Sequence, residues 1–156
     1  MDLKVKSYLE RAENELILAK ANFELSIKEE IKQMLKIPSG KTFFNDVISE
    51  SYYSIFYSAK AYLLSQGIET EAPEEHKKTY EEFKKLVDKG AVDVELLKIY
   101  QQLLTRADTL LKIFQTEKSK RGKFTYRILP QANNEPAKES LTNAETFFKH
   151  IIKLCK

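Results

Sequence analysis

The sequence predicts an all-α protein, an up-and-down bundle of about five helices, and two observations support this fold class. Apolar residues recur at alternating steps of three and four along most of the chain, which gathers them on one face of each helix. Pro- and Gly-containing turns interrupt this pattern at only a few places. With 156 residues, 42% of them hydrophobic and 31% charged, the chain is expected to form one domain spanning residues 1–156.

The segment from Asn45 to Gly67 is expected to form the central helix. Two neighbouring lines of residues make it apolar over most of its surface, with a lysine as the one charged member: Ile48, Tyr52, Ile55, Ala59 and Tyr62, then Tyr53, Phe56, Lys60 and Leu63. Such a helix must be covered by neighbours on several sides. The small residues Ser51, Ser54 and Ser58 allow close approach, and Gly67 fits the left-handed residue that ends a helix.

Four further helices are predicted around it. Their expected positions are Asp2 to Lys36, Pro73 to Gly90, a helix that follows Asp93 as its N-cap, and a last helix from about Glu135. The first of these is longer than an ordinary globular helix, which leaves room for a bend near Ser26, although no Gly or Pro requires one there. The charge-rich run that contains Lys84 is expected to be a solvated helix face, remote from any site.

Composition narrows the cellular setting. A net charge of +3 says little about partners, so a basic patch would have to be local. No apolar run approaches the length of a membrane span, and the N-terminus lacks the apolar core of a signal peptide. The single cysteine, Cys155, excludes an intramolecular disulfide and is expected to be a buried thiol. We therefore expect a cytoplasmic protein with no membrane association.

Motifs for common catalytic and cofactor chemistry are missing from the sequence. The two histidines, His76 and His150, lie far apart and neither has metal-ligand spacing to Cys155. Neither stands in a Glu-x-x-His pair, and no Gly-rich phosphate loop occurs. We predict no metal and no organic cofactor, and we expect His150 to lie at the rim of its helix.

One segment, from Glu117 to Asn134, lacks a core pattern and carries a concentration of cations. Two aromatic residues lie among five basic ones, and together they form the candidate nucleic-acid or nucleotide contacts: Lys118, Lys120, Arg121, Lys123, Phe124, Tyr126 and Arg127. Cations interleaved with aromatic rings suit phosphate contact and base stacking. The alternative is structural: lysines near a helix C-terminus are favoured by its dipole, and Phe124 would plug the end of the bundle.

Two parts of the chain resemble the HEPN domain, a family of small helical prokaryotic proteins often encoded beside a minimal nucleotidyltransferase. The first is the central helix, Tyr52-Tyr53-x-x-Phe56-x-x-Ala59-Lys60-Ala61-x-Leu63-Leu64-x-x-Gly67, followed by His76 and Phe83. The second begins with Lys120-Arg121-Gly122-Lys123-Phe124-Thr125-Tyr126 and continues through Pro130-Gln131-Ala132-Asn133, Pro136-Ala137 and Asn143-Ala144-x-x-Phe147. From Tyr52 to Phe147 the resemblance spans about two thirds of the chain.

The resemblance implies a function, but this chain departs from the family's catalytic pattern. Active ribonucleases of the family carry an Arg, four to six residues, then a His; Arg121 matches the Arg, whereas Tyr126, Arg127 and Ile128 occupy the positions for the His. We therefore expect a homodimer that binds a nucleotide or RNA and partners a minimal nucleotidyltransferase in a toxin–antitoxin or defence system. Two alternatives stay open: a metal-independent endoribonuclease using Arg121 and Tyr126 as catalytic candidates, and a scaffold that contacts no nucleic acid.

Overall fold

The computed structural model describes the backbone of residues 1–120 and 134–156 and the side chains of residues 1–110 and 134–156. This part of the chain contains six helices and no strand, which confirms the all-α prediction. The helices are α1 (Leu3–Ile27), α2 (Glu29–Met34), α3 (Phe44–Ser65), α4 (Glu75–Asp88), α5 (Val94–Lys120) and α7 (Asn134–Cys155).

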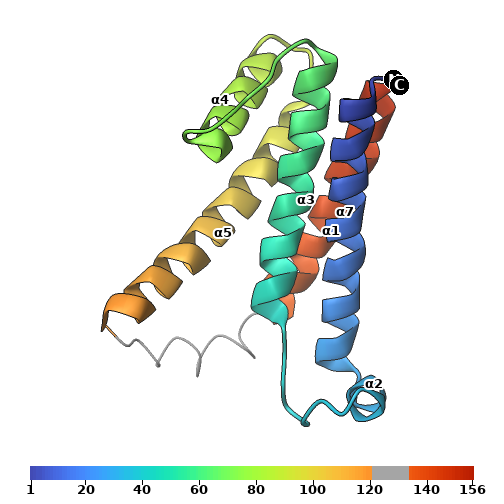
Figure 1. The fold of residues 1–156 in the computed structure, drawn as a ribbon, viewed down its shortest axis with the longest axis vertical. Helices are drawn as coiled ribbons and strands as arrows, with labels where there is room; N and C mark the ends of the chain where they lie inside the picture. The colour runs from blue at the N-terminus through green and yellow to red at the C-terminus, as the bar shows by residue number, and fades with distance from the viewer. Residues whose placement is uncertain (121–133) are drawn as a thin grey trace.

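The four longest helices, α1, α3, α5 and α7, alternate in direction, as in an up-and-down bundle (Figure 1). Helix α3 stands between α1 and α7 on one side and α4 and α5 on the other, and it contacts all four. Helix α5 diverges from α3 toward its C-terminal end, while α4 lies against the upper parts of both (Figure 1). The central helix predicted from the sequence is therefore central in the structure.

Close packing of α3 against α1 depends on small side chains. Ser54 and Ser58 are fully buried, and so are Ala12 and Ala19 on α1. The Ser54 hydroxyl donates to the Ala12 carbonyl at 2.8 Å, so a polar group buried between two helices is hydrogen-bonded. After α3, Gly67 has a φ of 79°, the left-handed conformation expected for the residue that ends this helix.

The predicted single helix from Asp2 to Lys36 is wrong in one respect, because it is divided into α1 and α2 at Lys28, which has an extended conformation. The division lies close to Ser26, where the length of the predicted helix left room for a bend. The Ser26 hydroxyl donates to the Asn22 carbonyl at 2.7 Å and accepts from the Phe43 amide at 2.7 Å. The end of α1 is thereby tied to the start of α3.

A cluster of aromatic rings forms the part of the core where α4, α5 and α7 meet. Phe83 of α4, Tyr100 of α5 and Phe147 of α7 are fully buried. Their ring centroids lie 5.4 to 5.9 Å apart in tilted or edge-to-face arrangements, which aromatic pairs prefer.

Helices α5 and α7 are also joined by a polar contact. Arg106 of α5 donates to the Ser140 hydroxyl at 2.9 Å. Arg106 is half-buried in this contact.

Leu103→Ala is expected to lower the free energy of unfolding by about 2–5 kcal/mol, because it leaves a cavity in a packed core. Leu103 is fully buried, whereas Ile17 on α1 is 58% exposed. Ile17→Ala therefore serves as the control and should change stability by less than about 0.5 kcal/mol. Urea denaturation measures both, and a Leu103→Ala variant as stable as Ile17→Ala would contradict this packing.

An acidic residue is held between α1 and α3. The Asn22 amide of α1 donates to both carboxylate oxygens of Glu50 on α3, at 2.8 and 3.0 Å. Partial burial raises the pKa of Glu50 to about 7, with smaller contributions from the neighbouring Asp46 and Glu15, while the Asn22 bond opposes the rise. Glu50 is therefore protonated in the folded protein at pH values where it is ionised in the unfolded chain.

This raised pKa predicts a pH-dependent stability. Between pH 4.5 and 7 the folded state holds a proton on Glu50 that the unfolded state has lost, so this contribution disappears as the pH rises through about 7. Glu50→Gln should therefore gain stability relative to the unaltered protein at pH 8 but not at pH 5.5, as measured by urea midpoints.

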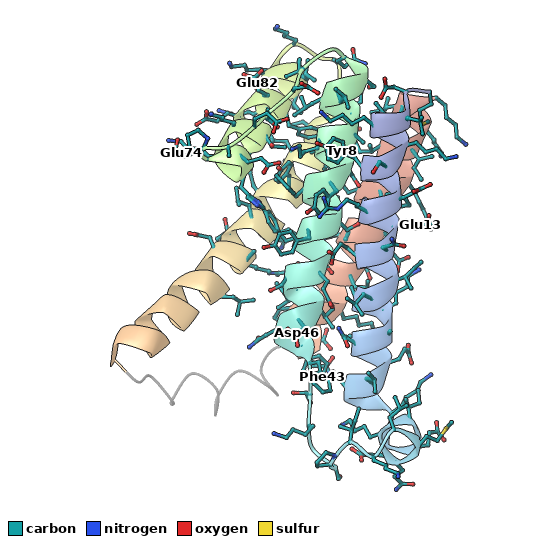
Figure 2. All side chains as sticks on the ribbon, viewed as in Figure 1. Tyr8, Glu13, Phe43, Asp46, Glu74 and Glu82 are labelled. Atoms are coloured by element: carbon teal, nitrogen blue, oxygen red, sulfur yellow. The ribbon has the colours of Figure 1, made fainter. Side chains whose placement is uncertain are left out.

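Glu13→Gln is the matched control for this experiment. Glu13 projects from the outer face of α1 (Figure 2) and is exposed. Its substitution should shift stability equally at the two pH values. A Glu50→Gln variant with the same pH dependence as the unaltered protein would count against a raised pKa.

Candidate functional site

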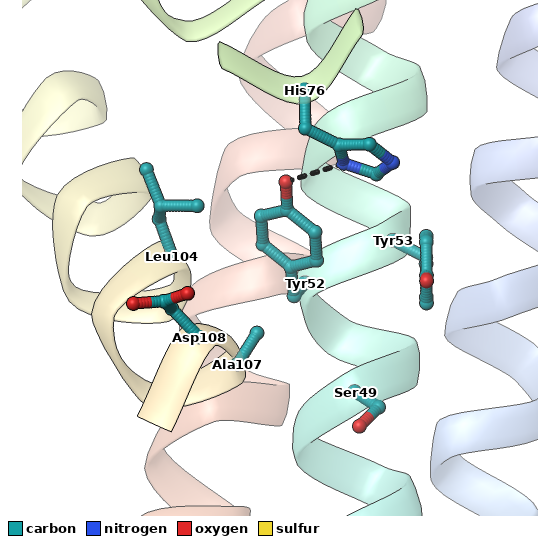
Figure 3. Close-up of a pocket in the computed structure, with 7 residues that line it drawn as sticks. All are labelled: Ser49, Tyr52, Tyr53, His76, Leu104, Ala107 and Asp108. Carbon is teal, nitrogen blue, oxygen red and sulfur yellow. Dashed lines mark hydrogen bonds between the residues drawn. The ribbon is translucent and has the colours of Figure 1, made fainter. Parts of the chain in front are cut away.

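A cavity of about 170 Å³ lies where α3, α4 and α5 meet. Its mainly apolar wall combines residues that are far apart in the sequence: Ser49, Tyr52 and Tyr53 from α3, His76 from α4, and Leu104, Ala107 and Asp108 from α5 (Figure 3). Concave apolar sites that carry a few polar groups are typical of ligand pockets. We therefore take this cavity as the candidate site.

His76 is held in the cavity wall by the aromatic face of α3. Its ring stacks on Phe56 with centroids 3.9 Å apart and planes inclined by 13°. Its Nδ1 shares a hydrogen bond of 2.7 Å with the Tyr52 hydroxyl, the contact drawn in Figure 3. The Tyr53 ring lies edge-on to the imidazole at 5.9 Å. Three aromatic residues of one helix therefore set the position of a histidine on another.

The first turn of α4 is anchored by a buried ion pair next to His76. Lys60 of α3 is only 5% exposed, and its ammonium contacts the Glu75 carboxylate. The same ammonium donates to the Thr70 carbonyl at 3.0 Å and lies 4.9 Å from the centroid of the Tyr8 ring. Burial alone would lower the pKa of Lys60, but the hydrogen bonds to Glu75 and Tyr8 outweigh it, and the net pKa is raised.

The electrostatics of the site keep the histidine–tyrosine pair uncharged. Burial against the rings lowers the pKa of His76, and the nearby Lys60 charge lowers it further while Glu75 opposes the change. Burial raises the pKa of Tyr52 well above its ordinary value, with the charges of Tyr53 and Asp108 adding to the rise. Neutral groups joined by a hydrogen bond suit binding better than proton transfer, because neither is poised to ionise near pH 7.

A charged groove adjoins the cavity between α4 and α5. It shares His76, Leu104 and Asp108 with the cavity wall, and its further lining includes the cations Lys77 and Lys84. Lys84 is exposed, as predicted. Its place beside Asp108 was not predicted, because the sequence suggested a charged face remote from any site. Glu81 lines the groove as well, so the structure brings apolar walls, two carboxylates and two lysines to one side of the bundle.

The candidate contacts in the basic segment largely fall outside the described residues. This applies to Arg121, Lys123, Phe124, Tyr126 and Arg127, whereas Lys118 and Lys120 belong to the described backbone of α5 but not to its described side chains. The cavity itself was missed by sequence reasoning. Its available signal was the pair of aromatic residues Tyr52 and Tyr53, which the helical pattern assigned to the core.

The two remaining chemistry-bearing residues near the C-terminus do not extend the site. His150 is exposed, as predicted, and its Nδ1 lies 2.9 Å from the Thr146 carbonyl one turn earlier. Cys155 is half-buried against the core, and burial raises the pKa of its thiol.

Within the described ranges, no group of three or more His, Cys, Asp or Glu side chains is arranged to hold a metal ion. No helix within these ranges combines the length and apolar character that crossing a bilayer demands.

Comparison with known proteins found no similar protein. No protein-family model matches the chain, and neither a curated protein nor a solved structure shows significant similarity to it.

The packing of His76 predicts a low titration midpoint. The imidazole should titrate below its ordinary value of about 6.5, because its ring is stacked on Phe56 and partly removed from water. As the pH falls below 6.5, the unfolded chain takes up a proton on His76 before the folded protein does. The contribution of His76 to the free energy of unfolding is therefore fully present above pH 6.5 and is lost as the pH falls through the folded-state pKa.

Proton NMR of the imidazole Cε1–H signals measures this midpoint directly. The chain has two histidines, so a His150→Gln variant leaves the signal of His76 alone. Tyr52→Phe keeps the ring stacking and should keep the midpoint low. A midpoint at or above 6.5 would show that the ring is not desolvated in solution.

Proposed function

We propose that this chain is a HEPN-type protein that contacts single-stranded RNA or a nucleotide along the α4–α5 side of its bundle. The observation that supports this best is the cavity between α3, α4 and α5, which opens beside a groove lined by Lys77 and Lys84. An apolar slot for a base next to cations for phosphate is the combination that single-strand binding proteins use.

The basic segment extends the same argument along the chain. Asp108, in the cavity wall, and Lys118 lie on the same helix, ten residues or about 15 Å apart at the rise of an α-helix. A single strand that occupies the groove would extend along α5 toward the backbone positions of Lys118 and Lys120. The proposed contacts also include Arg121, Lys123 and Arg127, which lie outside the described residues.

The proposed biological role follows from the family resemblance. The chain would act as a cytoplasmic homodimer and as the binding partner of a minimal nucleotidyltransferase in a toxin–antitoxin or defence system. Binding rather than cleavage is favoured because Tyr126 stands where active family members have a histidine. A tyrosine of ordinary pKa, near 10, is a poor general base at neutral pH.

RNA binding in this proposal depends steeply on salt. Each phosphate contact adds about 0.7 to the slope of log affinity against log salt for a single strand. Arg121→Ala, Lys123→Ala and Lys84→Ala should each weaken binding and reduce this slope, as measured by fluorescence anisotropy with a labelled oligonucleotide between 50 and 200 mM salt, a range chosen on the order of physiological ionic strength.

Lys153→Ala is the matched control, because Lys153 is exposed in the last turn of α7, away from α4 and α5. It should leave affinity and slope unchanged. Equal losses from Lys153→Ala and Lys84→Ala would reduce the interaction to general charge attraction and contradict a groove. RNA cleavage in excess chelator that disappears in Arg121→Ala would instead support the endoribonuclease.

A further inference from the structure

We infer that the cavity between α3, α4 and α5 is a base pocket that takes cytosine in preference to uracil, an inference that rests on the proposed function. Three features lead to it: the size of the cavity, the planar and apolar character of its walls, and the carboxylate of Asp108 in its wall. The size disfavours a purine, the walls suit a flat ring, and the carboxylate disfavours uracil.

The size of the cavity fits one six-membered ring. Its volume is about 170 Å³, and an apolar protein cavity on the order of 150 Å³ binds a single benzene molecule. A pyrimidine is one such ring, whereas the fused rings of a purine would extend out of the cavity into the adjoining groove. The cavity therefore favours a pyrimidine over a purine.

The walls suit a flat ring with polar edges. Tyr52 and Tyr53 form one side, and Leu104 and Ala107 form the opposite side on α5 (Figure 3). Enzymes that take up a flipped base stack it between aromatic and apolar side chains in the same way and read its edge with polar groups. The groove that continues from the cavity carries Lys77 and Lys84, which complement the phosphate attached to a nucleotide.

Asp108 distinguishes the two pyrimidines. A carboxylate accepts hydrogen bonds and donates none when ionised, and Asp108 is exposed to solvent in the cavity wall. Cytosine presents an amino group at C4, a donor that aspartate recognises, whereas uracil presents a carbonyl oxygen at the same position. The carboxylate therefore attracts the C4 amino group of cytosine and repels the C4 carbonyl oxygen of uracil. An aspartate has several lone pairs, so it can accept this bond beside its contacts within the protein.

The test compares labelled eight-nucleotide oligomers of cytidine and of uridine by fluorescence anisotropy at pH 7.5, about one pH unit above the ordinary pKa of histidine. The unaltered protein should bind the cytidine oligomer about tenfold more tightly, within the range that one base contact provides. In Asp108→Asn the ratio should fall to about one, because an amide can donate to uracil as well as accept from cytosine.

Two variants make this comparison specific. Glu81→Gln removes a negative charge from the adjoining groove but not from the cavity wall, so it should keep the tenfold ratio. Leu104→Phe narrows the cavity from the α5 side and should reduce binding of the cytidine oligomer to the level of the uridine oligomer. Thermal unfolding of each variant confirms that it is folded.

The failures of the two proposals are distinguishable. A ratio near one in the unaltered protein, or a ratio that survives in Asp108→Asn, overturns the cytosine pocket, while salt-dependent binding leaves the RNA function standing. If neither oligomer binds, cytidine and uridine monophosphates are titrated against the NMR signal of His76. A shift with cytidine monophosphate alone supports the pocket without the RNA function, and no shift with either overturns both.

Discussion

The burial of α3 on all sides is the constraint on which the structure depends. Its residues face α1 and α7 in one direction and α4 and α5 in the other, so few positions can reach water. Serine and alanine fill the closest approach to α1, while tyrosine and phenylalanine fill the wider space toward α4 and α5. The buried serines are tolerated where they bond to backbone, as Ser54 does to Ala12. Small residues therefore allow the close contact with α1, where Tyr57 and Phe44 also pack on aromatic rings of α1, while Tyr52 and Tyr53 line the cavity on the other side.

One charged residue on this buried helix links the core to the candidate site. An unpaired ammonium as buried as that of Lys60 would be costly, and removing one partner of such a pair destabilises a protein strongly. Glu75 and the Thr70 carbonyl supply the required partners, which holds the first turn of α4 against α3. His76 is the next residue, and this anchor brings its ring onto Phe56. The ion pair stabilises the fold and positions the histidine with the same contact.

The site joins an apolar cavity to a charged groove that is open to solvent. The cavity wall is apolar and keeps its histidine–tyrosine pair neutral, while the adjoining groove is lined by lysines in contact with solvent. Asp108 belongs to both, at the point where α5 passes from the packed core toward the end of the helix. A ligand that fits both environments has a flat, weakly polar ring and an anionic tail. Nucleotides have this chemistry, which is why the proposals for the groove and for the cavity concern one ligand class.

The sequence alone determined the helices, the central place of α3 and most of the core, because helical periodicity is local and residues such as Ile55 and Leu103 follow it. It left room for a bend near Ser26 but gave no sign of the break at Lys28, which lies next to a contact between distant residues, the hydrogen bond that the Phe43 amide donates to Ser26. The cavity was decided only by the tertiary structure. Tyr52, His76 and Asp108 come from three helices, and each alone reads as a core aromatic, an isolated histidine or a surface charge. Helix packing brings them together, and the distances between helices are not encoded in the periodicity of any one of them.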